Sequence, residues 1–202
     1  MLYNLLFPLA DGAGFFNLFQ YLTFRTGGAV LTGLLVSFLC GPALIRALKI
    51  RQGKGQPIRA DGPEGHLLTK QGTPTMGGVL ILLALLAGTL LWADLTTAYV
   101  WILLFVTLGF GAIGFMDDYL KVRRQHSDGV PGRIKLVLEI AIALGATFWI
   151  VSISAPPLEN GLTLPFVKSI IIDLGWFFIP FATLVMVGAS NAVNLTDGLD
   201  GL

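Results

Sequence analysis

The sequence predicts an all-α integral membrane protein, a polytopic bundle of about five transmembrane helices with its N-terminus outside and its C-terminus in the cytoplasm. Of its 202 residues, 54% are hydrophobic and only 12% are charged, whereas soluble domains carry about 25% charged residues. Five apolar runs are long enough to cross a bilayer, and basic residues collect in two of the intervening loops. We therefore treat residues 1–202 as a single transmembrane domain.

The elements follow in order from the apolar runs. Residues 1–25 are short and aromatic, which predicts an external or interfacial segment. A run of about 19 residues gives about 28 Å of helix, close to the hydrocarbon thickness of about 30 Å. Asp173 and Pro180 interrupt the fifth run. Turn-forming residues in the preceding loop, 154–173, are compatible with a small external hairpin or with an irregular loop. The predicted spans lie near 26–48, 76–93, 98–116, 136–154 and 170–189, and the fifth leads into an Asn/Asp motif at 191–202.

The basic residues set the orientation. The loops after the first and third spans, with the start of the fourth span, hold 11 of the 13 Lys and Arg residues, and only Arg25 and Lys168 fall on the other face. The positive-inside rule makes these two loops cytoplasmic. Five spans then place Leu202 inside. The net charge of +1 gives no reason to expect a nucleic-acid partner, and P-loop, Rossmann and zinc patterns are absent.

Acidic residues directly follow two of the apolar runs. Asp117 and Asp118 come after the third run, and Asp197 and Asp200 come after the fifth. Carboxylates at a helix C-terminus oppose the helix dipole, so their repetition at the cytoplasmic face indicates a metal or phosphate site. Neighbouring helix residues do not share a face, so one acid of the first pair could take a proton or face a metal while the other holds a lysine. The alternative is a pair of solvated acids balanced by nearby cations.

Asn and Asp recur every third residue in the last motif. Such spacing makes a slowly drifting stripe on a helix. Amide and carboxylate oxygens are ligands that Mg²⁺ prefers, which makes Asn194 and Asp197 candidate metal ligands. The same groups could hydrogen-bond ribose, uracil or sugar hydroxyls, and the alternative is an Asx-rich turn after a helix. The stripe consists of Asn191, Asn194, Asp197 and Asp200.

A third element precedes the second span. Thr73 and Pro74 suit the start of a helix, whose free N–H groups would lie near Lys70 and Thr75. This arrangement is compatible with an anion site, although we favour the simpler interpretation of an ordinary helix cap with a basic flank.

Three charged residues near the third and fourth spans are further candidates. Lys121 and Lys135 could hold phosphate or an anionic lipid headgroup, while the positive-inside bias alone accounts for most cytoplasmic cations. Glu139 lies inside a predicted span. We favour a structural role for it, such as a helical pair with Lys135.

Four stretches carry a family likeness: Asp61–His66, Gly72–Gly78, Gly114–Lys121 and Asn191–Leu202. Together they closely resemble the bacterial phospho-N-acetylmuramoyl-pentapeptide transferases, and the likeness runs from about Tyr21 to Leu202. The resemblance implies transfer of phospho-MurNAc-pentapeptide from its UDP donor to undecaprenyl phosphate, giving lipid I and UMP in peptidoglycan synthesis. It also implies Mg²⁺ as cofactor, membrane lipids as partners and a cytoplasm-facing active site in the bacterial inner membrane, and it is compatible with a homodimer.

The resemblance also implies residue roles. Asp117 and Asp118 would be the active-site acids, with Asp117 the better candidate to deprotonate the lipid phosphate. Family members are about twice as long, with further spans, another metal-binding Asp and a His-rich loop, so the chain resembles an N-terminal half and we expect it to be incomplete for catalysis. Asn191, Asn194, Asp197 and Asp200 would line the nucleotide and metal side, while Lys70, Thr75, Lys121 and Lys135 match polar positions around the same cleft.

Three other interpretations remain open. A related transferase that moves GlcNAc-1-phosphate to polyprenyl phosphate would share the acids and the metal. An ion-coupled transporter could use Glu139 and the span broken at Pro180, although transport sites usually lie near mid-membrane rather than at one face. The chain could also be a non-catalytic fragment that binds lipid phosphate.

Overall fold

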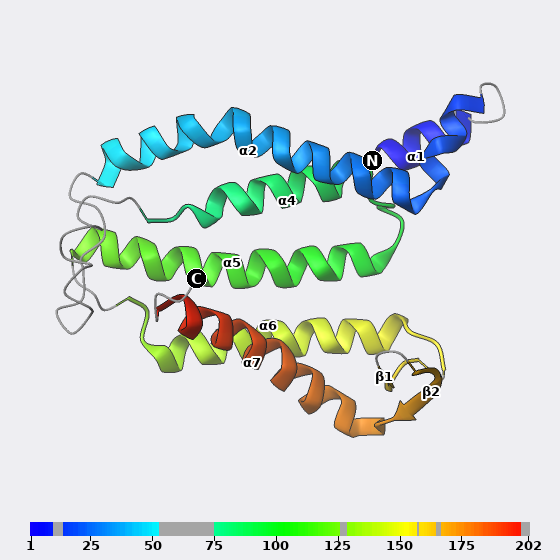
Figure 1. The fold of residues 1–202 in the computed structure, drawn as a ribbon. Coiled ribbons are helices and arrows are strands. Elements are labelled where there is room, and N and C mark those ends of the chain that lie inside the picture. Colours follow the sequence, from blue (N-terminus) through cyan, green and yellow to red (C-terminus); the bar gives the residue numbers. More distant parts are fainter. Residues whose placement is uncertain (10–13, 53–74, 126–128, 157, 165–166, 199–202) are drawn as a thin grey trace. The chain divides into compact units, whose positions relative to one another are not determined.

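The computed structural model describes residues 1–9, 14–52, 75–125, 129–156, 158–164 and 167–198, and most of these residues are helical (Figure 1). Contacts within the chain define two compact units, Met1–Pro131 and Gly132–Leu202. In the described part, four helices are long and apolar enough to cross a membrane, and a fifth apolar helix is shorter. The predicted class, a polytopic helical membrane protein with about five helices, is therefore confirmed.

The first unit is built from three apolar helices, α2, α4 and α5, which run in alternating directions. The C-terminal end of α2, the N-terminal end of α4 and the C-terminal end of α5 consequently lie at the same end of this unit (Figure 1). The short N-terminal elements pack at the opposite end, against α2 and α4. The elements are α1 (Leu2–Leu6), the 3₁₀ turns η1 (Phe7–Leu9) and η2 (Gly14–Gln20), α2 (Leu22–Gln52), α4 (Gly78–Trp92) and α5 (Ala98–Arg124).

Small residues let α2 and α4 approach closely. A Cβ on Gly88 of α4 would lie 3.0 Å from the carbonyl oxygen of Ala29 in α2. Gly28 leaves room for the indole ring of Trp92, whose Nε1 donates a hydrogen bond to Thr32 Oγ1 at 2.9 Å. Glycine and alanine are the residues that allow such close helix packing within a membrane.

The loop after α4 is fastened to the N-terminal segment by polar contacts. Asp94 Oδ1 accepts hydrogen bonds from Thr96 Oγ1 at 2.7 Å and from Asn4 Nδ2 at 2.8 Å. The bond from Thr96, followed by that from Asn4, lowers the pKa of the Asp94 carboxyl below its ordinary value. This polar lock lies at the opposite end of unit 1 from the acidic motif of α5.

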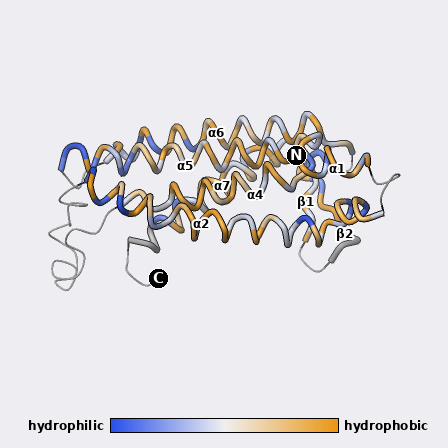
Figure 2. The backbone as a smooth tube through the Cα atoms, turned by 90° about the horizontal axis from the view of Figure 1, so that it is seen from above, coloured by the Kyte–Doolittle hydropathy of each residue, from blue (hydrophilic) through white to orange (hydrophobic). Residues whose placement is uncertain are grey.

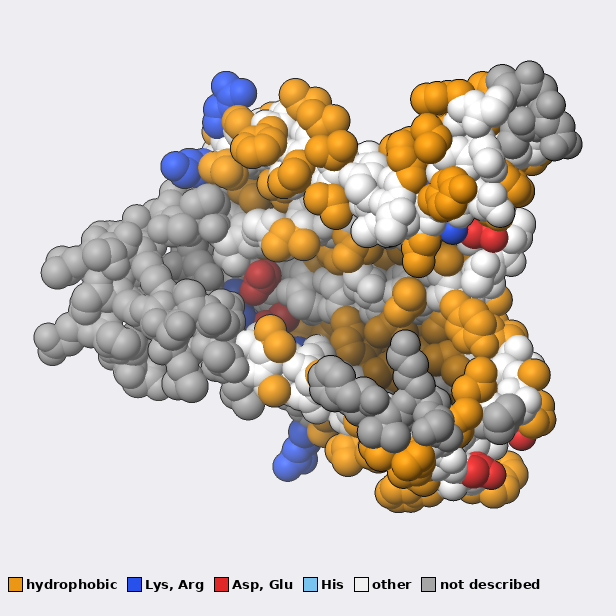
Figure 3. Space-filling view, turned by 45° about the vertical axis from the view of Figure 1, so that its right-hand side comes forward, with side chains coloured by type: hydrophobic (Ala, Val, Ile, Leu, Met, Phe, Trp, Pro, Cys, Tyr) orange, Lys and Arg blue, Asp and Glu red, His pale blue; other side chains and the backbone are white. Residues whose placement is uncertain are grey.

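Exposed apolar side chains dominate the helix surfaces. Phe38 and Leu39 in α2 are each 75% exposed, and Leu103 in α5 is 68% exposed. Figure 2 shows hydrophobic residues along most of the helical length, and Figure 3 shows them covering much of the visible face. Soluble monomers rarely expose apolar surface on this scale, whereas lipid accommodates it.

The second unit is a helical pair joined through a β-hairpin. Strand β1 (Gly161–Leu164) pairs antiparallel with β2 (Val167–Asp173), so of the two possibilities for the loop 154–173 the hairpin is the one that forms. The remaining elements are α6 (Gly132–Ile153), the 3₁₀ turn η3 (Gly175–Phe177) and α7 (Phe178–Gly198), and α6 packs against α7.

The fifth helix begins later than the predicted span at 170–189. Residues Ile170–Asp173 belong to β2, and α7 starts at Phe178. Hydropathy cannot separate a short apolar strand from a helix, and a run of three isoleucines favours the strand. Pro180 then lies in the first turn of α7, where the missing N–H leaves no helical hydrogen bond unmade.

Candidate active site

Helix α5 carries the first acidic motif past the end of the apolar run. The predicted span ended at residue 116 with the acids at a helix C-terminus, but α5 continues to Arg124 and ends where Gln125 adopts a φ of 50°. Lys121, Arg123 and Arg124 occupy its last turn, where positive charge interacts favourably with the helix dipole. The acids thus lie within the helix, so the dipole cost that we expected for them is smaller.

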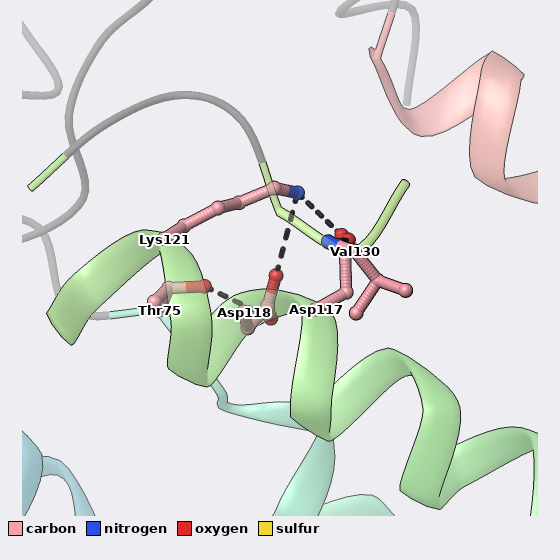
Figure 4. Close-up of polar contacts among 5 residues, drawn as sticks. All are labelled: Thr75, Asp117, Asp118, Lys121 and Val130. Carbon is pink, nitrogen blue, oxygen red and sulfur yellow. Dashed lines mark hydrogen bonds and ion pairs between the residues drawn. The ribbon is translucent and has the colours of Figure 1, made fainter. Parts of the chain in front are cut away.

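The two acids of α5 have different partners (Figure 4). Asp117 Oδ2 lies 2.6 Å from Lys121 Nζ, and Asp117 Oδ1 accepts a hydrogen bond from the backbone N–H of Val130 at 2.8 Å. Asp118 Oδ2 accepts a hydrogen bond from Thr75 Oγ1 at 3.1 Å, and its Oδ1 lies 3.8 Å from Lys121 Nζ. The lysine therefore bridges both carboxylates. The two acids therefore share the lysine and differ in a second partner, which is Val130 for Asp117 and Thr75 for Asp118.

The cluster is partly shielded from water. The side chains of Asp117 and Lys121 are 17% and 19% exposed, and that of Asp118 is 33% exposed. Partial burial makes ion pairs stronger than on an open surface and restricts their geometry. The acids are accordingly a fixed constellation rather than the two solvated loop acids of the alternative interpretation.

Gln52 is a member of the cluster that sequence reasoning missed. Its Nε2 donates to the carbonyl oxygen of Thr75 at 3.0 Å, and its Oε1 accepts from the N–H of Thr75 at 2.9 Å. Only 8% of Gln52 is exposed. The amide holds the backbone of Thr75 from both sides, and Thr75 in turn holds Asp118. A lone glutamine in the basic tail of α2 belongs to no motif or period, so no sequence signal could identify it.

Gly129 closes the cluster on the side of Asp117. A Cβ at this position would overlap Asp117 Oδ1 and would approach Cε of Lys121 to 3.0 Å. The missing side chain lets the backbone reach the carboxylate, which is how the N–H of the next residue becomes a donor.

In the second unit, the first residue of the Asn/Asp stripe contacts the intramembrane acid. Asn191 Nδ2 donates to Glu139 Oε2 at 2.5 Å and to the carbonyl oxygen of Val187 at 2.9 Å. The structure does not form the predicted helical pair of Glu139 with Lys135, because the carboxylate turns toward α7 and accepts from Asn191. Lys135 is half-buried in the first turn of α6.

The other predicted residues are less completely described. Asn194 is exposed on α7. The backbone of Asp197 is helical, but its side chain lies outside the described part, as do Lys70 and Asp200. Within the described part, no three His, Cys, Asp or Glu residues form a group that could hold a metal ion. The metal site at Asn194 and Asp197 therefore stays a prediction.

The fold and this cluster define a class: a multi-pass membrane protein with carboxylates and a lysine fixed near the end of a spanning helix. Residues 100–202 match the family model of glycosyl transferase family 4, and residues 70–82 match phospho-N-acetylmuramoyl-pentapeptide-transferase signature 1. Thr75 falls within the signature, and both acids of α5 fall within the family match.

A longer relative carries the same name as the signature. The chain is 59% identical over 202 residues to a phospho-N-acetylmuramoyl-pentapeptide-transferase of Granulibacter bethesdensis, an alignment that covers 100% of this chain and 56% of that protein. The chain therefore belongs to glycosyl transferase family 4, and it carries the first signature of the phospho-N-acetylmuramoyl-pentapeptide transferases. It spans about half the length of the curated relative that it matches.

Proposed function

We propose that the protein to which this chain belongs transfers phospho-MurNAc-pentapeptide from its UDP donor to undecaprenyl phosphate, giving lipid I and UMP. The signature at residues 70–82 and the 59% identity support this activity. The observation that carries the proposal is the network of Thr75, Asp117, Asp118 and Lys121 at one end of α5. A cytoplasm-facing site at this helix end would suit a soluble nucleotide-linked donor and a membrane-bound acceptor.

The proposed reaction requires the cluster to bring two polyanions, the lipid phosphate and the donor diphosphate, together. The lipid phosphate attacks the donor diphosphate, and one phosphoanhydride is exchanged for another with UMP as the leaving group. Asp117, which contacts a backbone N–H and Lys121, would take a proton from the lipid phosphate. Lys121 offers a positive charge to phosphate oxygens, because it can exchange a carboxylate partner for an incoming phosphate.

The donor set of the cluster fits a divalent cation. Two carboxylates face a single ammonium group, which leaves net negative charge on hard oxygen ligands of the kind Mg²⁺ prefers. When bound, Mg²⁺ supplies charge neutralisation on the diphosphate. Asn194 and Asp197 of α7 remain the proposed metal ligands, and the acids of α5 would add negative charge that favours a cation. Asn191 and Asp200 are proposed for the nucleotide side, with Lys70 and Lys135 toward phosphate.

A single substitution in the full-length enzyme tests the role of Asp117. Asp117→Asn keeps the size of the side chain and removes its basicity, so we expect turnover to fall by about 10²- to 10⁴-fold. Nucleotide binding should change only a few-fold, as measured by UMP titration. Asp173→Asn makes the same chemical change at an exposed position in β2 and serves as the control. A loss confined to nucleotide binding would overturn the proposed role.

The choice of donor separates this activity from that of its nearest rival. A GlcNAc-1-phosphate transferase would share the acids of α5, so the two activities differ in the sugar rather than in the cluster. Incubation with UDP-MurNAc-pentapeptide and with UDP-GlcNAc, each with undecaprenyl phosphate, should give product from the first donor only. Product from UDP-GlcNAc alone would favour the rival.

A further inference from the structure

We infer that Glu139 is a positioning residue that fixes the amide of Asn191 so that its carbonyl oxygen is the end presented to a ligand. The inference rests on the proposed function, because it concerns the nucleotide and metal side of the same transferase. Its evidence is separate, since both residues lie in the second unit, on α6 and α7.

The hydrogen bonds of Asn191 settle which way its amide faces. An amide nitrogen has two hydrogens, and both have acceptors here: Glu139 Oε2 at 2.5 Å and the carbonyl oxygen of Val187 at 2.9 Å. Turning the amide over would place its oxygen against two other oxygens, so the observed orientation is strongly preferred. No described residue donates to Asn191 Oδ1. That oxygen is the atom left to accept from an N–H or O–H group or to bind a hard cation.

Burying Glu139 inside α6 has a free-energy cost. It is only 2% exposed, inside a helix long and apolar enough to span a membrane. Ala143 and Ala146, further along α6, are fully buried and offer no polar atom from their side chains. Burying a carboxyl group costs free energy unless it is hydrogen-bonded, and ionisable groups inside spans usually serve function.

A neighbouring polar residue shows how a buried polar side chain can be satisfied without a contact to another helix. Thr147 is also fully buried on α6, and its hydroxyl donates to the carbonyl oxygen of Ala143 within its own helix at 2.8 Å. Among the described residues, it makes no side-chain hydrogen bond to α7. Glu139 instead reaches across to the first residue of the Asn/Asp stripe. The partner, rather than the burial alone, therefore distinguishes a positioning role from packing.

A double-mutant cycle in the full-length enzyme tests the inference. Glu139→Leu removes the acceptor and leaves an N–H donor of Asn191 without its partner, which costs about 1–3 kcal/mol, so kcat/KM should fall by about 5- to 150-fold. Glu139→Gln retains an acceptor oxygen and should stay within about fivefold of the wild type. In an Asn191→Ala background, Glu139→Leu should cost little more, because its only target is already gone. Thr147→Val is the matched control and should leave KM for the donor unchanged.

The outcomes distinguish this inference from the proposed function. If the losses from Glu139→Leu and Asn191→Ala multiply, the two residues act independently and the inference is wrong. If the wild-type enzyme makes no lipid-linked product, the proposed function fails. The double-mutant cycle is then measured as the change in melting temperature that UMP with Mg²⁺ causes in each variant. Additive losses in that shift, or no shift at all, would equally overturn the positioning role. Should Glu139→Leu not fold, Glu139→Met takes its place.

Discussion

Gly129→Ala is the substitution whose effect follows most directly from the geometry of the cluster. The new Cβ would occupy the space of Asp117 Oδ1. Gly129 is not among the glycines with positive φ, so alanine can adopt its backbone conformation. A compatible Gly→Ala change usually stabilises a fold by about 0.4–1 kcal/mol through the unfolded state. We therefore expect the substitution to displace the carboxylate of Asp117 without destabilising the fold.

The expected magnitude comes from the contact that the methyl group displaces. Val130 N–H donates to Asp117 Oδ1 at 2.8 Å, and a hydrogen bond to an ionised acceptor contributes about 1.5–3 kcal/mol. A difference of 1.4 kcal/mol is about tenfold, so we expect kcat/KM to fall by about 10- to 150-fold. The ion pair with Lys121 is also disturbed, since the same Cβ approaches Cε of Lys121 to 3.0 Å.

The assay is UMP release by the full-length enzyme with saturating undecaprenyl phosphate and varied nucleotide donor. Gly132→Ala is the control, because a Cβ there meets nothing within 4 Å and the substitution lies only three residues away. We expect this control to retain activity within about twofold, since surface changes of this kind rarely exceed about 0.5 kcal/mol. Wild-type turnover by Gly129→Ala, or an equal loss in both variants, would refute the reasoning.

Three further predictions concern the rest of the first unit. Thr75→Val deletes the hydroxyl that a carboxylate of α5 accepts at 3.1 Å, so activity should fall about tenfold in the UMP-release assay, while Thr75→Ser should restore most of it. Gly28→Ala would drive a methyl group into the ring of Trp92 and should lower the melting temperature, whereas Gly27→Ala, with nothing within 4 Å, should raise it slightly. The pKa of Asp94 is lowered, so its contribution to stability is present above the ordinary carboxyl pKa of about 4 and is lost as pH falls through the folded value. The melting temperature of Asp94→Asn should consequently fall less on acidification than that of the wild type, and equal slopes would contradict the assignment.

The fold could be predicted well because each span is a local property of the chain. Hydropathy over about 20 residues reports length and class, and turn-forming residues marked the hairpin before α7. The boundary error at Ile170–Asp173 arose because hydropathy ignores backbone preference. The extent of α5 was missed for a related reason, since a helix does not stop where its apolar side chains stop.

The contacts of the candidate site could be predicted only where they follow from residue type and spacing along one helix. Asp117 and Lys121 are four residues apart on one helix, so their pairing follows from helical geometry. The contributions of Gln52 and Gly129 depend on how separate segments meet, which no single-helix period encodes. The bond between Asn191 and Glu139 is of the same kind, because it requires the pairing of α6 with α7.

Lys121 contributes both to the charge bias that predicts the membrane orientation and to the geometry of the acidic cluster. Lys121 counts toward the positive-inside bias, yet the structure places its ammonium group between two carboxylates. The acids at 117 and 118 lie between the apolar run of α5 and its basic last turn. Basic residues next to a span sit at the level of anionic lipid headgroups. The acids are therefore expected at the depth where a lipid-linked phosphate would lie, and an enzyme that joins a soluble donor to a membrane acceptor needs its charged groups at that depth.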